Sequence, residues 1–241
     1  QPGDRRKGSL FKDIADSRVA RVMSSASTLQ RALTEAEANP SEELADLALW
    51  IAHGQRLDIA TIIRVEKQLP RTQLIQTYGC TEVSGPATAF SLDDLSTKAT
   101  SVPVGKPVSN TQVRVLDANE HLVPIGIAGE IWIGGDSLAK GYAGNQELTN
   151  QSFFVRGSHR WFRTGDLGKW LPDGNLEILG RADDVITIDS VTTSRYELEH
   201  LLASHPDVDQ AVVHTNRSDG AKLTGYVTAV SKKRPLREKE L

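Results

Sequence analysis

Up to about residue 90, short apolar runs alternate with stretches whose apolar positions recur every three or four residues. In 57–69 the spacing of Ile59, Ile62 and Ile63 is that of a buried helical face, and Pro70 ends the pattern. Strands that alternate with helices predict a parallel sheet covered by helices, with ligands at the carboxyl ends of the strands. We expect helices over 10–17, 28–38 and 57–69, and strands over 18–23, 47–52 and 73–77.

From about residue 102 the pattern changes to short extended segments separated by glycine and proline. The clearest is 170–179, in which two extended arms flank Pro172, Asp173 and Gly174. Proline presets one turn dihedral and glycine accepts a positive φ, so this segment predicts a β-hairpin. With the expected strands 112–116 and 130–133, the hairpin predicts a small antiparallel sheet or barrel.

After residue 184 the pattern changes once more, to a strand, a helix and two further strands. The predicted fold class is therefore α/β with a β-barrel-like part and an α+β part. We expect an α/β unit over 1–100, an antiparallel β unit over 101–182, an α+β unit over 183–230, and a charged tail or linker over 231–241. Within the α+β unit the expected strands are 185–188, 210–214 and 223–229, and the expected helix is 195–203.

The composition excludes several classes of function but does not identify one. The 241 residues carry a formal net charge of −3, which provides no basic field to attract nucleic acid. No apolar run approaches the ~20 residues that span a bilayer, and the single cysteine, Cys80, excludes an internal disulfide. We expect a globular cytoplasmic protein that binds neither nucleic acid nor membrane. Because the chain begins with Gln1 and ends in a charged stretch, we also expect it to be part of a longer protein.

Three separated segments together resemble the adenylate-forming ligase superfamily, and most closely the adenylation domains of nonribosomal peptide synthetases. They are YGCTE at 78–82, GEIWIGGDSLAKGYAGNQELTNQSF at 129–153 and RTGDLGKWLPDGNLEILGRADD at 163–184. Each alone is a weak signal, but their order and spacing follow the family over nearly the whole chain. The resemblance implies the second half of the large subdomain of such a domain, followed by part of its C-terminal subdomain.

The resemblance assigns nucleotide binding to the first segment. Tyr78 would stack on adenine, Thr81 would donate a hydrogen bond to the α-phosphate, and Glu82 would hold Mg²⁺. Gly79 and the earlier Gly54 would let the backbone approach the nucleotide closely. Without the resemblance, plainer interpretations stay open: Tyr78 as a core residue, and Glu82 as an exposed carboxylate at a strand end.

Further roles follow from the third segment. Asp166 matches the aspartate that accepts hydrogen bonds from both ribose hydroxyls, and Arg181 would also reach the nucleotide. Asp183 matches the hinge about which the C-terminal subdomain rotates between adenylation and thioester formation. Taken alone, Asp166 could equally cap a turn.

The acid would lie beside the nucleotide, in a pocket shaped by His53, Thr77 and Gly85. His53 stands where the family usually has a small residue. Cys80 stands where the family usually has proline or another small residue, and we interpret it as an inert thiol rather than a nucleophile.

Several departures from the family limit this assignment. The family's glycine-rich phosphate loop should precede Gln1 and its catalytic lysine should follow Leu241, so we expect this chain alone to be inactive. After the hinge, Thr187, Ser190 and Thr192 replace a lysine, a glycine and an arginine. The serine would narrow the channel for the pantetheine arm, and the cations would be lost.

The resemblance thus implies part of an enzyme that uses ATP and Mg²⁺ to activate an amino or related carboxylic acid as its acyl-AMP. The acyl group would pass to the phosphopantetheine thiol of a carrier protein, within a multidomain synthetase for nonribosomal peptides. Two alternatives stay open: a degenerate or interrupted adenylation domain that serves as a platform for neighbouring domains, and an acyl-CoA ligase with a diffusible thiol acceptor.

Overall fold

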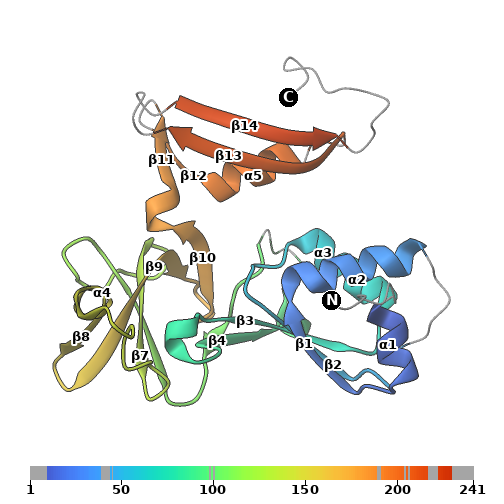
Figure 1. The fold of residues 1–241 in the computed structure, drawn as a ribbon, viewed down its shortest axis with the longest axis horizontal. Coiled ribbons are helices and arrows are strands. Elements are labelled where there is room, and N and C mark those ends of the chain that lie inside the picture. The colour runs from blue at the N-terminus through green and yellow to red at the C-terminus, as the bar shows by residue number, and fades with distance from the viewer. Residues whose placement is uncertain are drawn as a thin grey trace. The chain divides into compact units, whose positions relative to one another are not determined.

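The computed structural model places the chain in two compact units, each described separately below (Figure 1). The first unit contains Gln1–Thr164 and Lys169–Ile178, and the second contains Gly165–Gly168 and Leu179–Leu241. The domain boundaries expected from the sequence stay a prediction. The structure describes residues 10–38, 44, 46–97, 99, 101–188, 191–203, 205, 207–216 and 222–229.

The first unit begins with a five-stranded mixed sheet in the order β1-β2-β3-β4-β5. Strands β1, β2 and β3 are parallel, whereas β4 and β5 are antiparallel to their neighbours. The strands are β1 (Arg21–Ser25), β2 (Leu49–His53), β3 (Gln73–Tyr78), β4 (Thr88–Ser91) and β5 (Lys106–Pro107), and the helices are α1 (Leu10–Asp16), α2 (Ala26–Ala38) and α3 (Ile59–Gln68).

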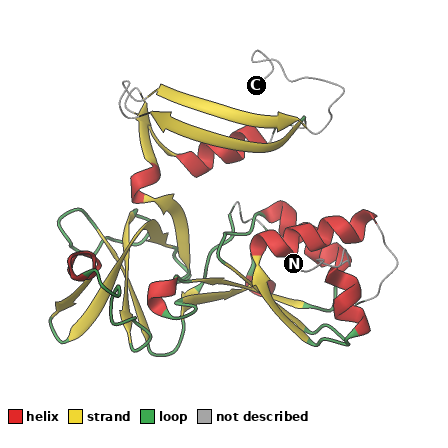
Figure 2. Cartoon of the chain, viewed as in Figure 1, coloured by secondary structure: helices red, strands yellow, loops and turns green. Residues whose placement is uncertain are grey.

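Side-chain alternation divides this sheet into two different faces. Trp50 and Ala52 of β2 and Leu74 of β3 are buried in one core together with Leu29 and Leu33 of α2. Residues of the opposite parity, such as Met23 and Ile51, pair across the strands in register and are more exposed. Helices α1, α2 and α3, which are red in Figure 2 like all helices, therefore supply the apolar partners of one face.

The predicted strands and helices of this sheet are confirmed, with ends that differ by up to three residues. The first strand begins at Arg21 rather than at residue 18. Helix α1 ends in a tight turn in which Arg18 adopts a left-handed conformation (φ 49°) and the Val19 amide donates to the Ile14 carbonyl. The chain therefore becomes extended only after this turn.

A buried amide joins the sheet to the start of α3. Gln76 is 0% exposed, and its Oε1 accepts a hydrogen bond of 2.9 Å from the Leu57 amide.

Replacing Gln76 by methionine leaves the buried main-chain amide of Leu57 without its acceptor, so we expect the free energy of unfolding to fall by about 1–3 kcal/mol. Urea unfolding measures the change. The same replacement of the exposed Gln73 on this strand should alter stability by less than about 0.5 kcal/mol, and equal losses would contradict this role of the amide.

The chain continues into a curled antiparallel sheet in the order β10-β9-β7-β6, with β8 pairing β9. Most of this sheet belongs to the first unit, whereas residues 165–168 of β9 and 179–181 of β10 belong to the second. Its core contains Ile131, Ile133, Phe162 and Leu176, and Val83 of the preceding segment packs into it. The elements are β6 (Thr111–Leu116), β7 (Gly129–Gly135), α4 (Gln146–Ser152), β8 (Phe153–Arg156), β9 (His159–Trp170) and β10 (Leu176–Arg181).

The predicted hairpin is confirmed in this sheet. The Leu171 amide donates to the Asn175 carbonyl over 2.8 Å, and the Gly174 amide donates to the Leu171 carbonyl over 2.9 Å. Gly174 has a φ of 82°, a left-handed conformation that glycine adopts without steric cost. The hairpin turn therefore fixes where β9 ends and where β10 begins.

The second unit contains a two-stranded ladder, a helix and a longer two-stranded ladder. The predicted helix at 195–203 is confirmed, and β12 was not expected. No helix among the described residues combines the length and the apolar content needed to cross a membrane. The elements are η3 (Ala182–Asp184), β11 (Val185–Ile188), β12 (Val191–Ser194), α5 (Arg195–Ala203), β13 (Val208–Asn216) and β14 (Lys222–Ala229).

Candidate functional site

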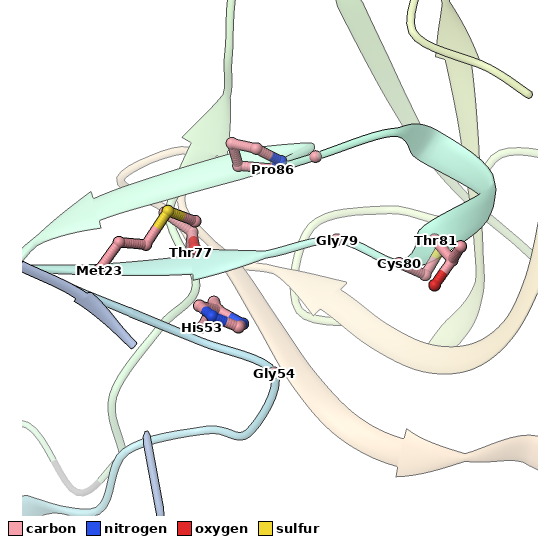
Figure 3. A pocket seen from close by; sticks show the side chains of 9 residues that line it. Met23, His53, Gly54, Thr77, Gly79, Cys80, Thr81 and Pro86 are labelled. Carbon is pink, nitrogen blue, oxygen red and sulfur yellow. The ribbon is translucent and has the colours of Figure 1, made fainter. Parts of the chain in front are cut away.

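A cavity of about 240 Å³ opens at the carboxyl ends of β1, β2 and β3 (Figure 3). The sequence pattern predicted ligand binding at this edge of the sheet. The His53 imidazole, the Thr77 and Thr81 hydroxyls and the Cys80 thiol give the cavity its polar side chains. Its full lining is Met23, His53, Gly54, Thr77, Gly79, Cys80, Thr81, Gly85 and Pro86.

Two glycines shape the walls of this cavity for different reasons. Gly54 turns the chain after β2 with a φ of 87°, a conformation that other residues rarely adopt. Gly79 lies so close to the following loop that a Cβ atom would overlap the carbonyl oxygen of Gly85. The loop closes where the Ala87 amide donates to the Tyr78 carbonyl over 2.7 Å.

The short helix η1 (Thr81–Val83) follows β3 and presents two of the predicted functional side chains. Val83 is 0% exposed and anchors this turn in the core of the curled sheet. Its amide donates to the Cys80 carbonyl over 3.1 Å. With the turn anchored on Val83, Thr81 stays exposed and Glu82 half-buried.

A distant segment holds the Glu82 side chain. The Tyr142 hydroxyl donates a hydrogen bond of 2.7 Å to Glu82 Oε1, and the Ala139 amide donates to the Glu82 carbonyl, also over 2.7 Å. Burial, together with the hydrogen bond to Glu82, raises the pKa of the Tyr142 phenol above its usual 10.0. The phenol therefore stays protonated at neutral pH and acts as the donor.

The second unit contains the other three predicted residues, joined through one guanidinium group. Arg181 Nη1 lies 3.3 Å from Asp166 Oδ1, and Arg181 Nε lies 3.1 Å from Asp183 Oδ1. The hydrogen bond to Asp183 raises the pKa of Arg181. Gly165 has a φ of 71°, and a Cβ atom there would press against the Arg181 guanidinium. This glycine allows the arginine to lie beside Asp166.

The described residues contain no group of three or more histidine, cysteine, aspartate and glutamate side chains that could hold a metal ion. Magnesium does not need such a group, because it keeps several waters and is bound through one or two carboxylates plus substrate phosphates. The half-buried carboxylate of Glu82, beside the exposed hydroxyl of Thr81, fits that donor set.

The structure brings six predicted site residues together around the cavity: His53, Gly54, Thr77, Gly79, Thr81 and Gly85. Tyr78 and Glu82 are their neighbours in the chain, and Asp166, Arg181 and Asp183 meet in the second unit. The roles assigned to all eleven stay predictions.

Sequence reasoning missed two residues of the lining, Met23 and Pro86, and did not place Cys80 in it. The signal for Met23 was available, because it lies on a predicted strand of the parallel sheet. Figure 3 shows its side chain among the residues that line the cavity.

Of the three residues after the hinge that differ from the family pattern, two lie in the part of the chain that the structure describes. Thr187 and Thr192 are Cα partners in the antiparallel pair β11–β12, so both lie on the ladder rather than in a loop. Ser190 lies outside the described residues. The expected narrowing of a channel by Ser190 therefore stays a prediction.

Comparison with known proteins identifies the family. Residues 1–143 match the model of the family described as AMP-binding enzyme. The chain belongs to this family. It is 36% identical to Bacitracin synthase 1 of Bacillus licheniformis over 192 residues, which make up 77% of this chain and 4% of that protein. It is also 37% identical to Enterobactin synthase component F of Escherichia coli O157:H7, over 71% of this chain and 14% of that protein.

Solved structures of AMP-binding enzymes have the same fold. O-succinylbenzoate coenzyme A synthetase (MenE) of Bacillus subtilis, in complex with AMP, matches 96% of this chain with a TM-score of 0.80 and 21% identity. PA1221, an NRPS protein containing adenylation and PCP domains, matches 93% with a TM-score of 0.66 and 24% identity. The chain spans 45% and 46% of these two structures. The predicted resemblance and fold class are thus confirmed.

Proposed function

We propose that this chain is part of an adenylation domain that activates an amino or related carboxylic acid with ATP as its acyl-AMP. The observation that carries the proposal is the loop after β3, which presents Thr81 and Glu82 beside a cavity at the carboxyl ends of three parallel strands. A hydroxyl and a hard oxygen ligand next to a small cavity suit an acid that meets a nucleotide phosphate.

Each residue has one task in this proposal. Tyr78 stacks on adenine, while Gly54 and Gly79 let the backbone approach the nucleotide. Thr81 donates a hydrogen bond to the α-phosphate, and Glu82 holds Mg²⁺, which when bound neutralises phosphate charge. Asp166 accepts hydrogen bonds from the ribose hydroxyls, and Arg181 contacts the nucleotide. The acid pocket is shaped by His53, Thr77 and Gly85.

The reaction needs little covalent chemistry from the protein. The carboxylate of the acid attacks the α-phosphorus of ATP, a phosphoanhydride bond breaks, and pyrophosphate leaves. Thr81 and the metal site at Glu82 stabilise charge on the phosphate oxygens. The contribution of the protein is therefore positioning and electrostatics.

We further propose that the acceptor of the acyl group is the phosphopantetheine thiol of a carrier protein in a multidomain synthetase. The similarity to Bacitracin synthase 1 and to Enterobactin synthase component F supports this acceptor over a diffusible thiol. In this reading Asp183 is the hinge, and it lies in η3, at the point where β10 ends and the α+β part begins.

A second candidate is a degenerate adenylation domain that serves as a platform for its neighbours. Thr187, Ser190 and Thr192 favour it, because none of them supplies the charge or the small size of the residue expected there. This candidate predicts a protein that keeps its nucleotide-binding residues but does not catalyse adenylation.

Acid-dependent exchange of labelled pyrophosphate into ATP tests the main proposal. The native protein that contains this chain would be assayed against amino, hydroxy and aryl acids. We expect exchange with at least one acid. A complete lack of exchange, beside a working adenylation domain as control, would favour the platform.

The chain of 241 residues by itself is expected to bind ATP only weakly, with a dissociation constant above the micromolar range. The resemblance places the phosphate loop and the catalytic lysine outside this sequence, so about half of the phosphate contacts would be missing. Calorimetry with ATP and Mg²⁺ measures the affinity. Micromolar or tighter binding would contradict this expectation.

A further inference from the structure

Residues 139–142, none of which was predicted as a site residue, hold Glu82 through two hydrogen bonds. Tyr142 donates through its hydroxyl to Glu82 Oε1 over 2.7 Å, and Ala139 donates through its amide to the Glu82 carbonyl. The two bonded residues Glu82 and Tyr142 are 60 positions apart in the sequence. Both the side chain and the main chain of Glu82 are therefore tied to residues 139–142.

This segment is itself held rigidly, so the Tyr142 hydroxyl has a defined position. The guanidinium of Arg160 donates to the Ala139 carbonyl over 2.6 Å and to the Lys140 carbonyl over 2.8 Å. The Tyr142 amide donates to Thr149 Oγ1 over 2.9 Å. The Tyr142 ring also meets the Phe153 ring edge-on, with the centroids 5.8 Å apart.

A donor in a fixed position restricts the rotamers that a carboxylate can adopt. A hydrogen bond to a charged acceptor is roughly twice as strong as one between neutral groups. Hydrogen-bonded partners of metal ligands orient the ligand, and their loss typically costs about 10–100-fold in metal affinity. The Tyr142 hydroxyl is such a hydrogen-bonded partner of Glu82, the proposed metal ligand.

We propose that Tyr142 is a positioning residue for Mg²⁺, which acts by holding the Glu82 carboxylate in the orientation that receives the metal-bound nucleotide. This inference rests on the proposed function, in which Glu82 holds Mg²⁺. It adds to that function Tyr142 from the segment between β7 and α4, which reaches the metal site through its hydrogen bond to Glu82.

The test compares three single variants of the native protein: Tyr142→Phe, Glu82→Gln and Tyr226→Phe. Tyr142→Phe keeps the ring that packs on Phe153 and removes only the hydroxyl. Tyr226→Phe makes the same change at a tyrosine that is 62% exposed in the second unit. Thermal unfolding of each variant verifies that it is folded.

The readout is the affinity for α,β-methylene-ATP, measured by calorimetry with Mg²⁺ and again with EDTA. The ratio of the two affinities reports how strongly metal and nucleotide binding are coupled. We expect this ratio to fall about tenfold or more in Tyr142→Phe and in Glu82→Gln. The affinity without metal should stay unchanged in Tyr142→Phe, and Tyr226→Phe should match the wild type in both conditions.

A double variant separates action through Glu82 from general damage. If Tyr142 acts through this carboxylate, the variant with both Tyr142→Phe and Glu82→Gln should lose no more coupling than Glu82→Gln alone. Additive losses, or a loss of metal-free affinity in Tyr142→Phe, would overturn the inference.

The outcomes also distinguish the inference from the function beneath it. A normal ratio in Tyr142→Phe beside a reduced ratio in Glu82→Gln rejects the role of Tyr142 and leaves the proposed function intact. A normal ratio in Glu82→Gln rejects the metal assignment, and the inference fails with it.

Discussion

Replacing Asp166 by alanine is expected to reduce acid-dependent pyrophosphate exchange by about a hundredfold or more. In the proposed function this carboxylate accepts a hydrogen bond from each ribose hydroxyl, and each bond to a charged group contributes about 1.5 kcal/mol or more. The loss of both, about 3 kcal/mol, corresponds to roughly two orders of magnitude in affinity. The affinity for AMP, measured by calorimetry, should fall by the same factor.

The fold should survive this change, because Arg181 retains its contact with Asp183 when Asp166 is removed. Asp173→Ala is the matched control. This aspartate accepts a hydrogen bond of 3.0 Å from the Asn175 amide in the hairpin turn, so its loss affects the turn and not the nucleotide. Equal exchange rates in Asp166→Ala and Asp173→Ala would contradict the ribose assignment.

The second large effect is expected from Gly79→Ala. The new methyl group would overlap the Gly85 carbonyl oxygen and lie 3.1 Å from the Ala87 amide nitrogen. Both are main-chain atoms, so the loop between Tyr78 and Ala87 must move. We expect a loss of about 2–3 kcal/mol in the free energy of unfolding, as for other overpacked sites, and a fall in Tm of about 5–10 °C.

Activity should fall further than stability in this variant. A displacement of Thr81 and Glu82 by about 1 Å can cost around a hundredfold in rate. Gly157→Ala is the control, since Gly157 has a positive φ of 65° with open space around it. It should lose about 1–2 kcal/mol from backbone strain alone and keep its exchange activity. A Gly79→Ala protein that exchanges pyrophosphate normally would contradict the close approach in this loop.

The fold was predictable where periodicity ran through several turns or strand residues. The helical pattern of 57–69 became α3, which buries Ile62 and Val65, whereas Ile63, which we expected on the buried face, is 59% exposed. Strands β4 and β5 were missed because four residues and two residues are too few to show alternation. Their pairing depends instead on the buried Thr88, whose hydroxyl donates to the Val104 carbonyl over 2.6 Å.

The cavity was predictable in part from topology. Because the carboxyl ends of parallel strands meet at one edge, the strand pattern predicts a site beside His53 and the Tyr78 loop. Thr77 was predicted from the family resemblance. Met23 was overlooked although it lies on the neighbouring strand, where it is the register partner of Ile51. The bond between Tyr142 and Glu82 has no local signal, because it depends on how two separate sheets of the first unit pack together.

The most direct test of the account is to detect the acyl-adenylate itself. The native protein would be mixed with ATP, Mg²⁺ and each acid of the panel, then quenched and analysed by mass spectrometry. The account predicts an adenylate of one or a few acids, dependent on ATP and absent in Asp166→Ala. Failure to form an adenylate with any acid, while a known adenylation domain forms one under the same conditions, would contradict it.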